Sequence, residues 1–195
     1  MFKKFVQTDA ALRRSPVWHR RLLDDAAILA CMAYVDLNPI RAGMAETPEQ
    51  SDFTSIQERL RQFATSSQTE TPTEQPADLL PFIGGEHADA PKGIAFTLPD
   101  YLQLVDWTGR AVRDDKRGAI PAHIQPIFQR MGLKHEEWPE IVQNFGRRYR
   151  LAAGAVERLR AFSQRLGRYW LQGVGASRRF YQPPSPNPLE SPGSG

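Results

Sequence analysis

Two helical patterns of apolar and polar residues occupy the first third of the chain. The first follows Asp24 or Asp25, either of which is a good N-cap. One apolar stripe of this helix consists of Ile28, Met32 and Val35. Pro39 disfavours the helical conformation at Asn38, so we expect the helix to end near that residue. The second pattern extends from Ser51 to Phe63, where Ser55 and Glu58 have the spacing of a capping box.

Further helices are predicted between residues 91 and 181. Thr97 and Asp100 have capping spacing ahead of an apolar run. Short helices fit 123–131 and 135–145, with Gly132 and Gly146 at the positions of C-terminal caps. A longer arginine-rich helix is predicted from Arg147 to Trp170. No segment has the pattern of a strand, so the chain is predicted to be mainly α.

Composition divides the chain into five predicted segments. They are an N-terminal segment 1–23, a helical segment 24–63, an acidic linker 64–90 rich in Pro, Ser and Thr, a basic helical domain 91–181 and a tail 182–195. The composition of the linker and of the tail is typical of disorder. Residues 79–83 form a short apolar group that could dock locally on the helical part.

The overall composition limits the class of protein. Hydrophobic residues make up 41% of the 195 residues, but no apolar run reaches the roughly 20 residues of a membrane helix. No signal-peptide pattern follows the first residues. We therefore expect a cytoplasmic protein without a membrane partner. Cys31 is the only cysteine, which excludes an internal disulfide and a cysteine-based zinc site.

Charge is distributed unevenly, although the formal net charge is only +3. Residues 66–90 carry acidic groups without Lys or Arg, whereas residues 143–181 carry many arginines and one acidic residue, Glu157. Such a basic segment, with Tyr and Trp between the arginines, favours nucleic acid, although a solvated helix face has the same pattern. The candidate DNA-binding residues are Arg147, Arg148, Arg150, Arg168, Arg178 and Arg179.

Tyr34 and Asn38 form the most specific pattern in the sequence. They are four residues apart on one predicted helix, so their oxygens share a face. Oxygen ligands are typical of Mg²⁺ or Mn²⁺, and a tyrosine can form a covalent phospho-intermediate. The alternative is a core tyrosine followed by an Asn-Pro helix stop.

Residues 34–43, Tyr-Val-Asp-Leu-Asn-Pro-Ile-Arg-Ala-Gly, resemble the tyrosine-helix signature of REP-associated and related single-tyrosine transposases of the HUH class. Residues 46–59 continue the match. Residues 101–121 and 143–148 are similar to the C-terminal extension of some bacterial members, so that the likeness covers about 24–181.

The resemblance implies a function on DNA. Members bind single-stranded or hairpin DNA, and their tyrosine attacks a phosphodiester to leave a 5′-phosphotyrosine and a free 3′-hydroxyl. A divalent metal, Mg²⁺ or Mn²⁺, is held by two histidines of a His-hydrophobic-His strand and by a polar residue one turn beyond the tyrosine. By position, Tyr34 is the nucleophile and Asn38 the third metal ligand. The family fold is a sheet flanked by helices.

The chain departs from this pattern upstream of Tyr34. Its histidines are unpaired: His19, His87, His123 and His135. Only 33 residues precede Tyr34, which leaves no room for the sheet. We therefore expect a truncated remnant that keeps the tyrosine helix but lacks the sheet and the metal-binding histidine pair, with impaired catalysis. His19 is the one candidate for a substitute ligand.

Three functions remain open from the sequence. The first is a transposase-family DNA-binding protein, and the second is a non-catalytic nucleic-acid-binding module. The third is an interaction protein that forms a homo-oligomer or associates with an intact transposase. In the last case Trp107, Trp138 and Trp170 would serve as anchors, although tryptophans are more often core residues.

Overall fold

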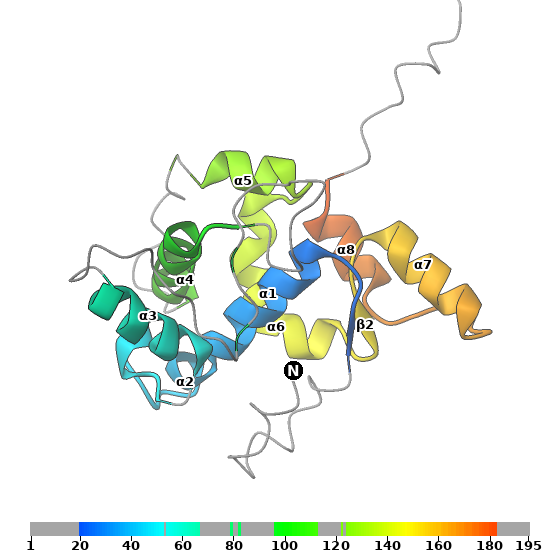
Figure 1. The fold of residues 1–195 in the computed structure, drawn as a ribbon. Coiled ribbons are helices and arrows are strands. Elements are labelled where there is room, and N and C mark those ends of the chain that lie inside the picture. Colours follow the sequence, from blue (N-terminus) through cyan, green and yellow to red (C-terminus); the bar gives the residue numbers. More distant parts are fainter. Residues whose placement is uncertain are drawn as a thin grey trace, which may run out of the picture.

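The computed structural model consists mainly of α-helices, as Figure 1 shows, and confirms the predicted mainly α class. It describes residues 20–52, 54–66, 79, 82, 96–112, 122 and 124–182. The α-helices are α1 (Asp25–Asp36), α2 (Asn38–Arg41), α3 (Ser55–Ser66), α4 (Leu98–Val112), α5 (Gln125–Arg130), α6 (Trp138–Arg148), α7 (Val156–Arg165) and α8 (Val174–Phe180). The 3-10 helices are η4 (Pro48–Gln50) and η5 (His135–Glu137), and the strands are β1 (Arg21–Leu22) and β2 (Ala152–Ala153).

Helix α1 begins at the predicted cap. The Asp24 carboxylate accepts a hydrogen bond of 2.8 Å from the backbone N–H of Ala27. The helix ends at Asp36, and α2 begins at Asn38 after a single intervening residue. Proline is tolerated in the first turn of a helix because the N–H it lacks has no partner there. Pro39 therefore ends α1 near the predicted place without preventing a second, shorter helix.

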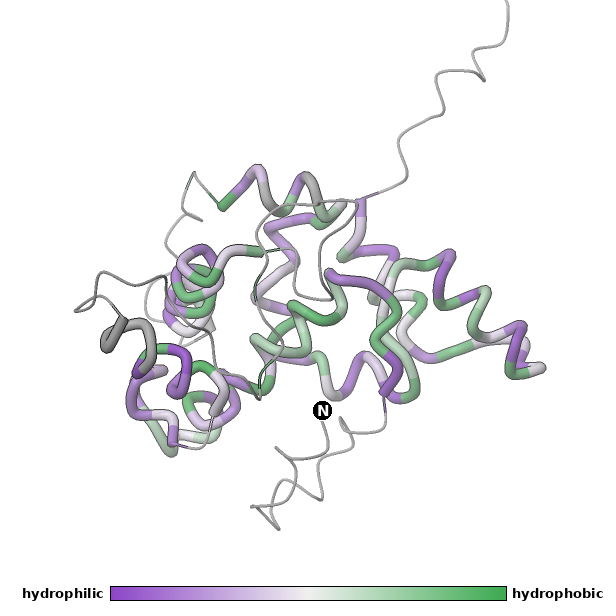
Figure 2. Tube along the Cα trace, in the orientation of Figure 1, coloured by the Kyte–Doolittle hydropathy of each residue, from purple (hydrophilic) through white to green (hydrophobic). Residues whose placement is uncertain are grey.

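The principal partner of α1 is α6, which crosses it in the centre of Figure 1. The buried face of α1 consists of small and branched apolar residues: Ala26, Ala27, Leu29, Ala30 and Ala33. Figure 2 shows this apolar helix in the middle of the molecule. The predicted stripe of Ile28, Met32 and Val35 is only half-buried. The face that α6 covers is therefore the alanine-rich one, whose small side chains let the two helices approach closely.

Helix α3 has a different cap from the predicted one. Ser55 is already inside the helix, and its hydroxyl donates to the Asp36 carboxylate at 2.7 Å. The cap is Thr54, whose hydroxyl oxygen accepts from the backbone N–H of Gln57 at 3.4 Å. The predicted capping box of Ser55 and Glu58 is therefore wrong by one residue, because a tertiary partner engages the serine.

Asp36 joins three helices at the end of α1. It is completely buried, and its Oδ2 atom accepts a 2.6 Å hydrogen bond from the Tyr101 hydroxyl on α4. Its Oδ1 atom accepts from the Ser55 hydroxyl and, at 3.3 Å, from the backbone N–H of Ile56. Burial raises the pKa of Asp36, although these hydrogen bonds and the Arg59 charge partly oppose the rise.

Trp138 is the largest completely buried side chain of the core. Its indole N–H donates a 2.8 Å hydrogen bond to the Thr108 hydroxyl of α4. Its ring meets the Phe128 ring edge-on, with the centroids 5.2 Å apart, and lies 6.0 Å from the Phe180 ring. One side chain thus joins α4, α5, α6 and α8. Trp107 is also buried, so two of the three candidate anchor tryptophans are core residues.

The predicted arginine-rich helix from Arg147 to Trp170 is wrong. Helix α6 ends at Arg148, and α7 covers only part of the expected range. Gly154 lies between them at a φ of +156°, and a Cβ atom there would lie 2.9 Å from both Asp24 Oδ2 and Leu23 Cβ. A residue with a side chain does not fit, because the backbone passes directly against the start of α1.

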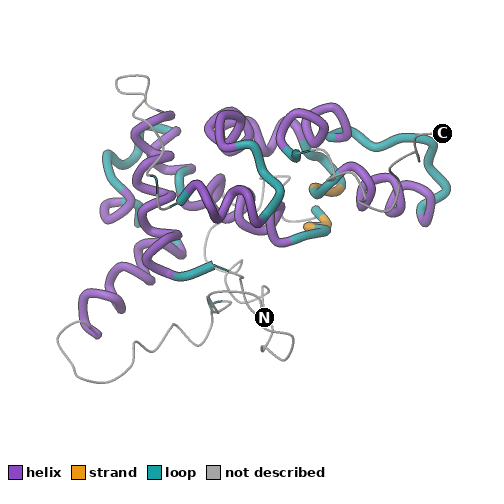
Figure 3. The backbone as a smooth tube through the Cα atoms, turned by 90° about the horizontal axis from the view of Figure 1, so that it is seen from above, coloured by secondary structure: helices purple, strands orange, loops and turns teal. Residues whose placement is uncertain are grey.

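This close approach is a short parallel pairing that the sequence did not predict. Strand β1 pairs with β2, with Arg21 opposite Ala152 and Leu22 opposite Ala153. Figure 3 shows the two strands as brief segments among the helices. Asp24 extends the connection, because its Oδ2 atom accepts from the backbone N–H of Ala155 at 2.7 Å. Residues near the start and near the end of the described chain are thereby held together.

Of the remaining helix predictions, some are confirmed and others are wrong. The Thr97 cap is confirmed, since its hydroxyl accepts from the Asp100 N–H at 3.2 Å. Gly132 follows α5 with a φ of +63°, as predicted for a C-terminal cap. Gly146 is not a cap, because α6 continues through it to Arg148. The helix expected from His135 begins as a 3-10 turn before α6.

Residues of both predicted helical segments, 24–63 and 91–181, contribute to one hydrophobic core. Phe82 docks on this core, with its ring centroid 5.0 Å from that of Tyr101. The predicted N-terminal segment up to residue 19, most of the linker and residues 183–195 lie outside the described residues, as do His19, His87 and His123. Among the helices that the structure describes, none is both long and apolar enough to cross a membrane.

Candidate nucleic-acid interface

Tyr34 lies at the contact between α1 and α6. Its ring packs on the Phe145 ring, with the centroids 5.9 Å apart, and the Arg41 guanidinium carbon lies 4.1 Å from the centre of the Tyr34 ring. The Tyr34 hydroxyl makes no hydrogen bond to any described residue. Tyr34 lines a surface depression of about 720 Å³ together with Gln143 and Arg147. The predicted nucleophile is thus partly accessible and next to positive charge.

Gly146 allows this position of the phenol. A Cβ atom on Gly146 would lie 2.6 Å from the Tyr34 hydroxyl oxygen and 3.1 Å from Cζ, so the hydroxyl occupies the place of the missing side chain. The Gly146 carbonyl oxygen accepts a 2.6 Å hydrogen bond from Arg20 Nη2. Tyr34 and Arg20, which are 14 positions apart in the sequence, therefore meet at one point of α6.

Arg20 is a buried cation with unused hydrogen-bond donors. It is 8% exposed, and its Nε and Nη1 atoms have no hydrogen-bond partner among the described residues. Burial lowers the pKa of Arg20; Cys31 and Tyr34 partly oppose this shift, and the charge of Arg150 adds slightly to it. A buried charge with unsatisfied donors is costly, and an anion at this place would reduce that cost.

Asn38 is not arranged as a metal ligand. Its Oδ1 atom accepts a 2.9 Å hydrogen bond from Arg41 Nη2, so a cationic side chain already occupies the position of a cation. Arg41 also donates to the carbonyl oxygens of Tyr34 at 3.3 Å and Gln143 at 3.0 Å. Within the described ranges no group of three or more His, Cys, Asp or Glu side chains could hold a metal. The described residues do not fit the Mg²⁺ or Mn²⁺ site that the resemblance implies.

Cys31 is not a candidate nucleophile, although it lies on α1 one turn before Tyr34. Burial raises the pKa of the Cys31 thiol to about 12, and the nearby Arg20 charge only partly opposes this rise. The thiolate, rather than the thiol, is the reactive form. Cys31 therefore stays protonated and serves as an apolar side chain near neutral pH.

Four neighbouring depressions place the six predicted arginines on one continuous surface, since Gln172 lines all four. The depression at Tyr34 includes Arg150, and the next two are formed around α8 and the chain between α7 and α8. We call this region the arginine surface. Its arginines are Arg41, Arg147, Arg148, Arg150, Arg160, Arg168, Arg178 and Arg179.

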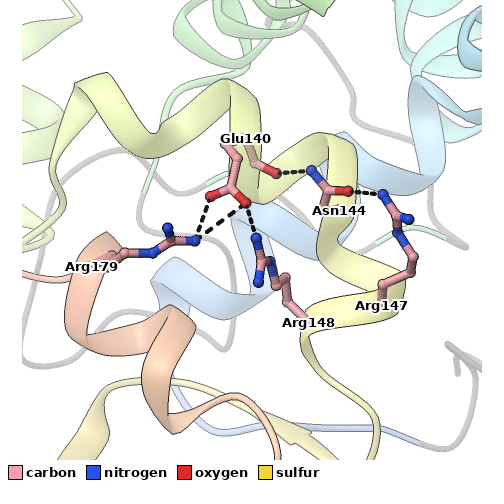
Figure 4. Close-up of polar contacts among 5 residues, drawn as sticks. All are labelled: Glu140, Asn144, Arg147, Arg148 and Arg179. Atoms are coloured by element: carbon pink, nitrogen blue, oxygen red, sulfur yellow. Dashed lines mark hydrogen bonds and ion pairs between the residues drawn. The ribbon is translucent and has the colours of Figure 1, made fainter.

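Glu140 orders one part of the arginine surface (Figure 4). Its carboxylate accepts a 2.6 Å hydrogen bond from Arg148 and a 3.2 Å hydrogen bond from Arg179, which joins α6 to α8. Asn144 accepts a hydrogen bond from Arg147 on the same helix. Arg148 and Arg179 thus share one carboxylate, whereas Arg147 contacts the uncharged Asn144 amide. The predicted residues are not equivalent as phosphate contacts.

Sequence reasoning missed three residues of this site. Arg41 lies within the quoted motif, but its stacking on Tyr34 depends on the short helix α2. Gly146 was given a capping role, and its position in the middle of a continuing apolar pattern is the signal for a close approach. Arg20 carries no local signal, because its partners lie on helices far along the chain.

Replacing Gly146 with alanine should displace the Tyr34 ring without unfolding the chain. The new methyl group collides with the flexible end of the tyrosine, while alanine improves helix propensity by about 1 kcal/mol. We expect little change in thermal stability and faster nitration of Tyr34 by tetranitromethane, located by mass spectrometry. Gly175→Ala is the matched control, since a Cβ atom there meets nothing within 4 Å. Equal nitration rates in both variants would contradict this geometry.

No protein-family model matches the chain, and no match was found among curated proteins or among solved structures.

Proposed function

We propose that this chain is a DNA-binding protein of the single-tyrosine transposase type, which binds single-stranded or hairpin DNA on the arginine surface. The observation that carries the proposal is the place of Tyr34. Tyr34, whose hydroxyl has no hydrogen-bond partner among the described residues, lines a depression together with Arg41, Arg147 and Arg150. Arginine side chains bind phosphate oxygens through paired N–H donors, so this depression has the chemistry of a phosphodiester site.

Arg20 supports the same proposal from inside the protein. Its Nε and Nη1 atoms are buried without partners, beside the backbone of Gly146 on which the Tyr34 hydroxyl lies. A DNA phosphate next to Tyr34 would lower the free energy of this buried cation through space. The site is therefore more favourable for an anion than an array of solvated arginines.

Binding without strand cleavage is the activity that the described residues support best. In the transposases that residues 34–43 resemble, cleavage by the tyrosine requires a metal held by a histidine pair and a polar residue. Here the Oδ1 atom of Asn38 accepts a hydrogen bond from Arg41 instead. We therefore propose a transposase remnant that retains the tyrosine helix and its affinity for DNA. The expected partners remain a second copy of the chain or an intact transposase.

Replacing Arg147 and Arg150 together with glutamine should weaken binding to a labelled 20-nucleotide single strand. Each phosphate contact to a single strand contributes about 0.7 to the slope of log affinity against log salt concentration. Loss of both should lower the slope by about 1.4. Fluorescence anisotropy between 50 and 300 mM NaCl, roughly the range in which counterion release is large, measures the change.

The matched control replaces Arg61 and Arg110, which are exposed on α3 and α4, and it should leave the slope unchanged. Wild-type binding that is insensitive to salt, or absent, would refute the proposed function. A hairpin substrate incubated with Mg²⁺ or Mn²⁺ tests the absence of cleavage. A covalent protein–DNA adduct that disappears in Tyr34→Phe would show that the chain still cleaves DNA.

A further inference from the structure

The segment between α7 and α8, residues 166–173, carries an exposed aromatic pair. Tyr169 is fully exposed and Trp170 is 73% exposed, whereas the other tryptophans of the described chain, Trp107 and Trp138, are buried. Aromatic side chains of this size normally contribute to a core or to a binding surface. Two adjacent exposed rings therefore indicate a ligand.

The backbone around the aromatic pair is held at several points. The Ser163 hydroxyl donates a 2.6 Å hydrogen bond to the Arg168 carbonyl oxygen, and the Arg168 N–H donates to the Ser163 carbonyl oxygen at 3.0 Å. Leu171, directly after the pair, is buried. Gln172 donates to the Arg147 carbonyl oxygen at 2.8 Å. The rings are thus presented from a fixed segment, which reduces the entropy lost when a ligand binds.

Positive charge lies on both sides of the aromatic pair. Tyr169 and Trp170 line one depression together with Arg150 and Arg168, and a second one together with Arg160 and Arg178. Aromatic faces between arginines match a single nucleic-acid strand, in which phosphates alternate with unstacked bases. In a duplex the base faces are covered by neighbouring base pairs, so the rings have no partner there.

We infer that residues 166–173 form a base-stacking platform that gives the arginine surface a preference for single-stranded DNA. This inference rests on the proposed function, because the arginines supply the phosphate contacts. The first depression shares Arg150 and Gln172 with the depression at Tyr34. A strand stacked on Trp170 can therefore continue along the surface towards the tyrosine hydroxyl.

The test compares Trp170→Ala with wild type on a 12-nucleotide oligo-dT and on a duplex of the same length. Stacking contributes a factor of about 5 to 150 in affinity for each base, so we expect a loss in this range for the single strand. Duplex affinity and the salt slope should stay within error, because no phosphate contact is removed. Trp170→Phe should restore most of the affinity, since it retains an aromatic face.

Leu166→Ala is the matched control, because Leu166 is exposed in the same segment but has no aromatic face. Equal single-strand affinity of Trp170→Ala and wild type would overturn the platform while leaving salt-dependent binding, and thus the proposed function, intact. Absence of any wild-type binding would overturn both. A change of oligomeric state in Trp170→Ala, with unchanged DNA affinity, would also overturn it and identify a second copy as the ligand.

Discussion

Replacing Trp138 with alanine should lower the free energy of unfolding by about 3–5 kcal/mol, the range typical of large aromatic deletions in a core. Trp138 is 0% exposed and joins four helices. Its removal leaves a cavity next to Phe128 and Phe180. The Thr108 hydroxyl also loses the hydrogen bond that it accepts from the indole N–H. Urea unfolding followed by circular dichroism measures the loss.

Two variants separate the causes of this loss. Trp138→Phe keeps most of the ring contacts but removes the hydrogen bond to Thr108, and we expect a smaller cost of about 1–3 kcal/mol. Trp170→Ala removes the same side chain from an exposed position and should change stability by less than about 0.5 kcal/mol. Equal destabilisation by Trp138→Ala and Trp170→Ala would contradict the core described above.

Asp36→Ala should lower the free energy of unfolding by about 3 kcal/mol. The substitution leaves the buried Tyr101 hydroxyl without its acceptor, and each unsatisfied buried polar group costs about 1–3 kcal/mol. The Ser55 hydroxyl and the Ile56 N–H at the start of α3 lose the same partner. Hydrogen exchange should show faster opening at the start of α3 than in α6.

The pH dependence of Asp36 gives a second measurement on the same residue. Burial raises its pKa in the folded state, so the folded protein favours the protonated form. The protonated Asp36 carboxyl therefore adds to the free energy of unfolding. This contribution is complete below the pKa of Asp in the unfolded chain, about 4, and is lost as pH rises through the pKa of Asp36 in the folded state. Asn imitates the neutral acid, so wild type should lose stability relative to Asp36→Asn between pH 4 and pH 7. An unchanged difference over this range would contradict the raised pKa.

Local patterns predicted the parts of the fold that depend on near neighbours. Asp24 and Thr97 act as caps because their partners are three residues away. Tyr34 and Asn38 were predicted on one helix, but α1 ends at Asp36 and Asn38 begins α2, so the two residues are linked through Arg41, which contacts both. Ser55 shows where such reasoning fails, since it satisfies the capping rule but donates to Asp36, 19 residues earlier. Its alternative partner is invisible in the local sequence.

The candidate site could likewise be predicted only in part. The number of arginines in residues 147–179 indicated a basic region, but the sequence predicted a single long helix there instead of α6, α7, α8 and the segments between them. The partners of the individual arginines could not be predicted, since Glu140 on α6 accepts hydrogen bonds from both Arg148 on α6 and Arg179 on α8. The break in the predicted long helix at Gly154 has the same origin, because Leu23 and Asp24 approach that glycine from more than 120 positions away.

Asp24 contacts residues far along the chain as well as the first turn of α1. Besides capping α1, its carboxylate accepts a 2.7 Å hydrogen bond from the Tyr181 hydroxyl, and β1 pairs with residues 152–153. Both partners, residues 152–153 and Tyr181, follow α6 in the sequence. Because the alanine-rich face of α1 is covered by α6, about 100 residues later in the chain, we expect α1 to be stabilised late, by long-range closure. A polypeptide that ends before Trp138, and so lacks α6, should leave this face of α1 open to proteases.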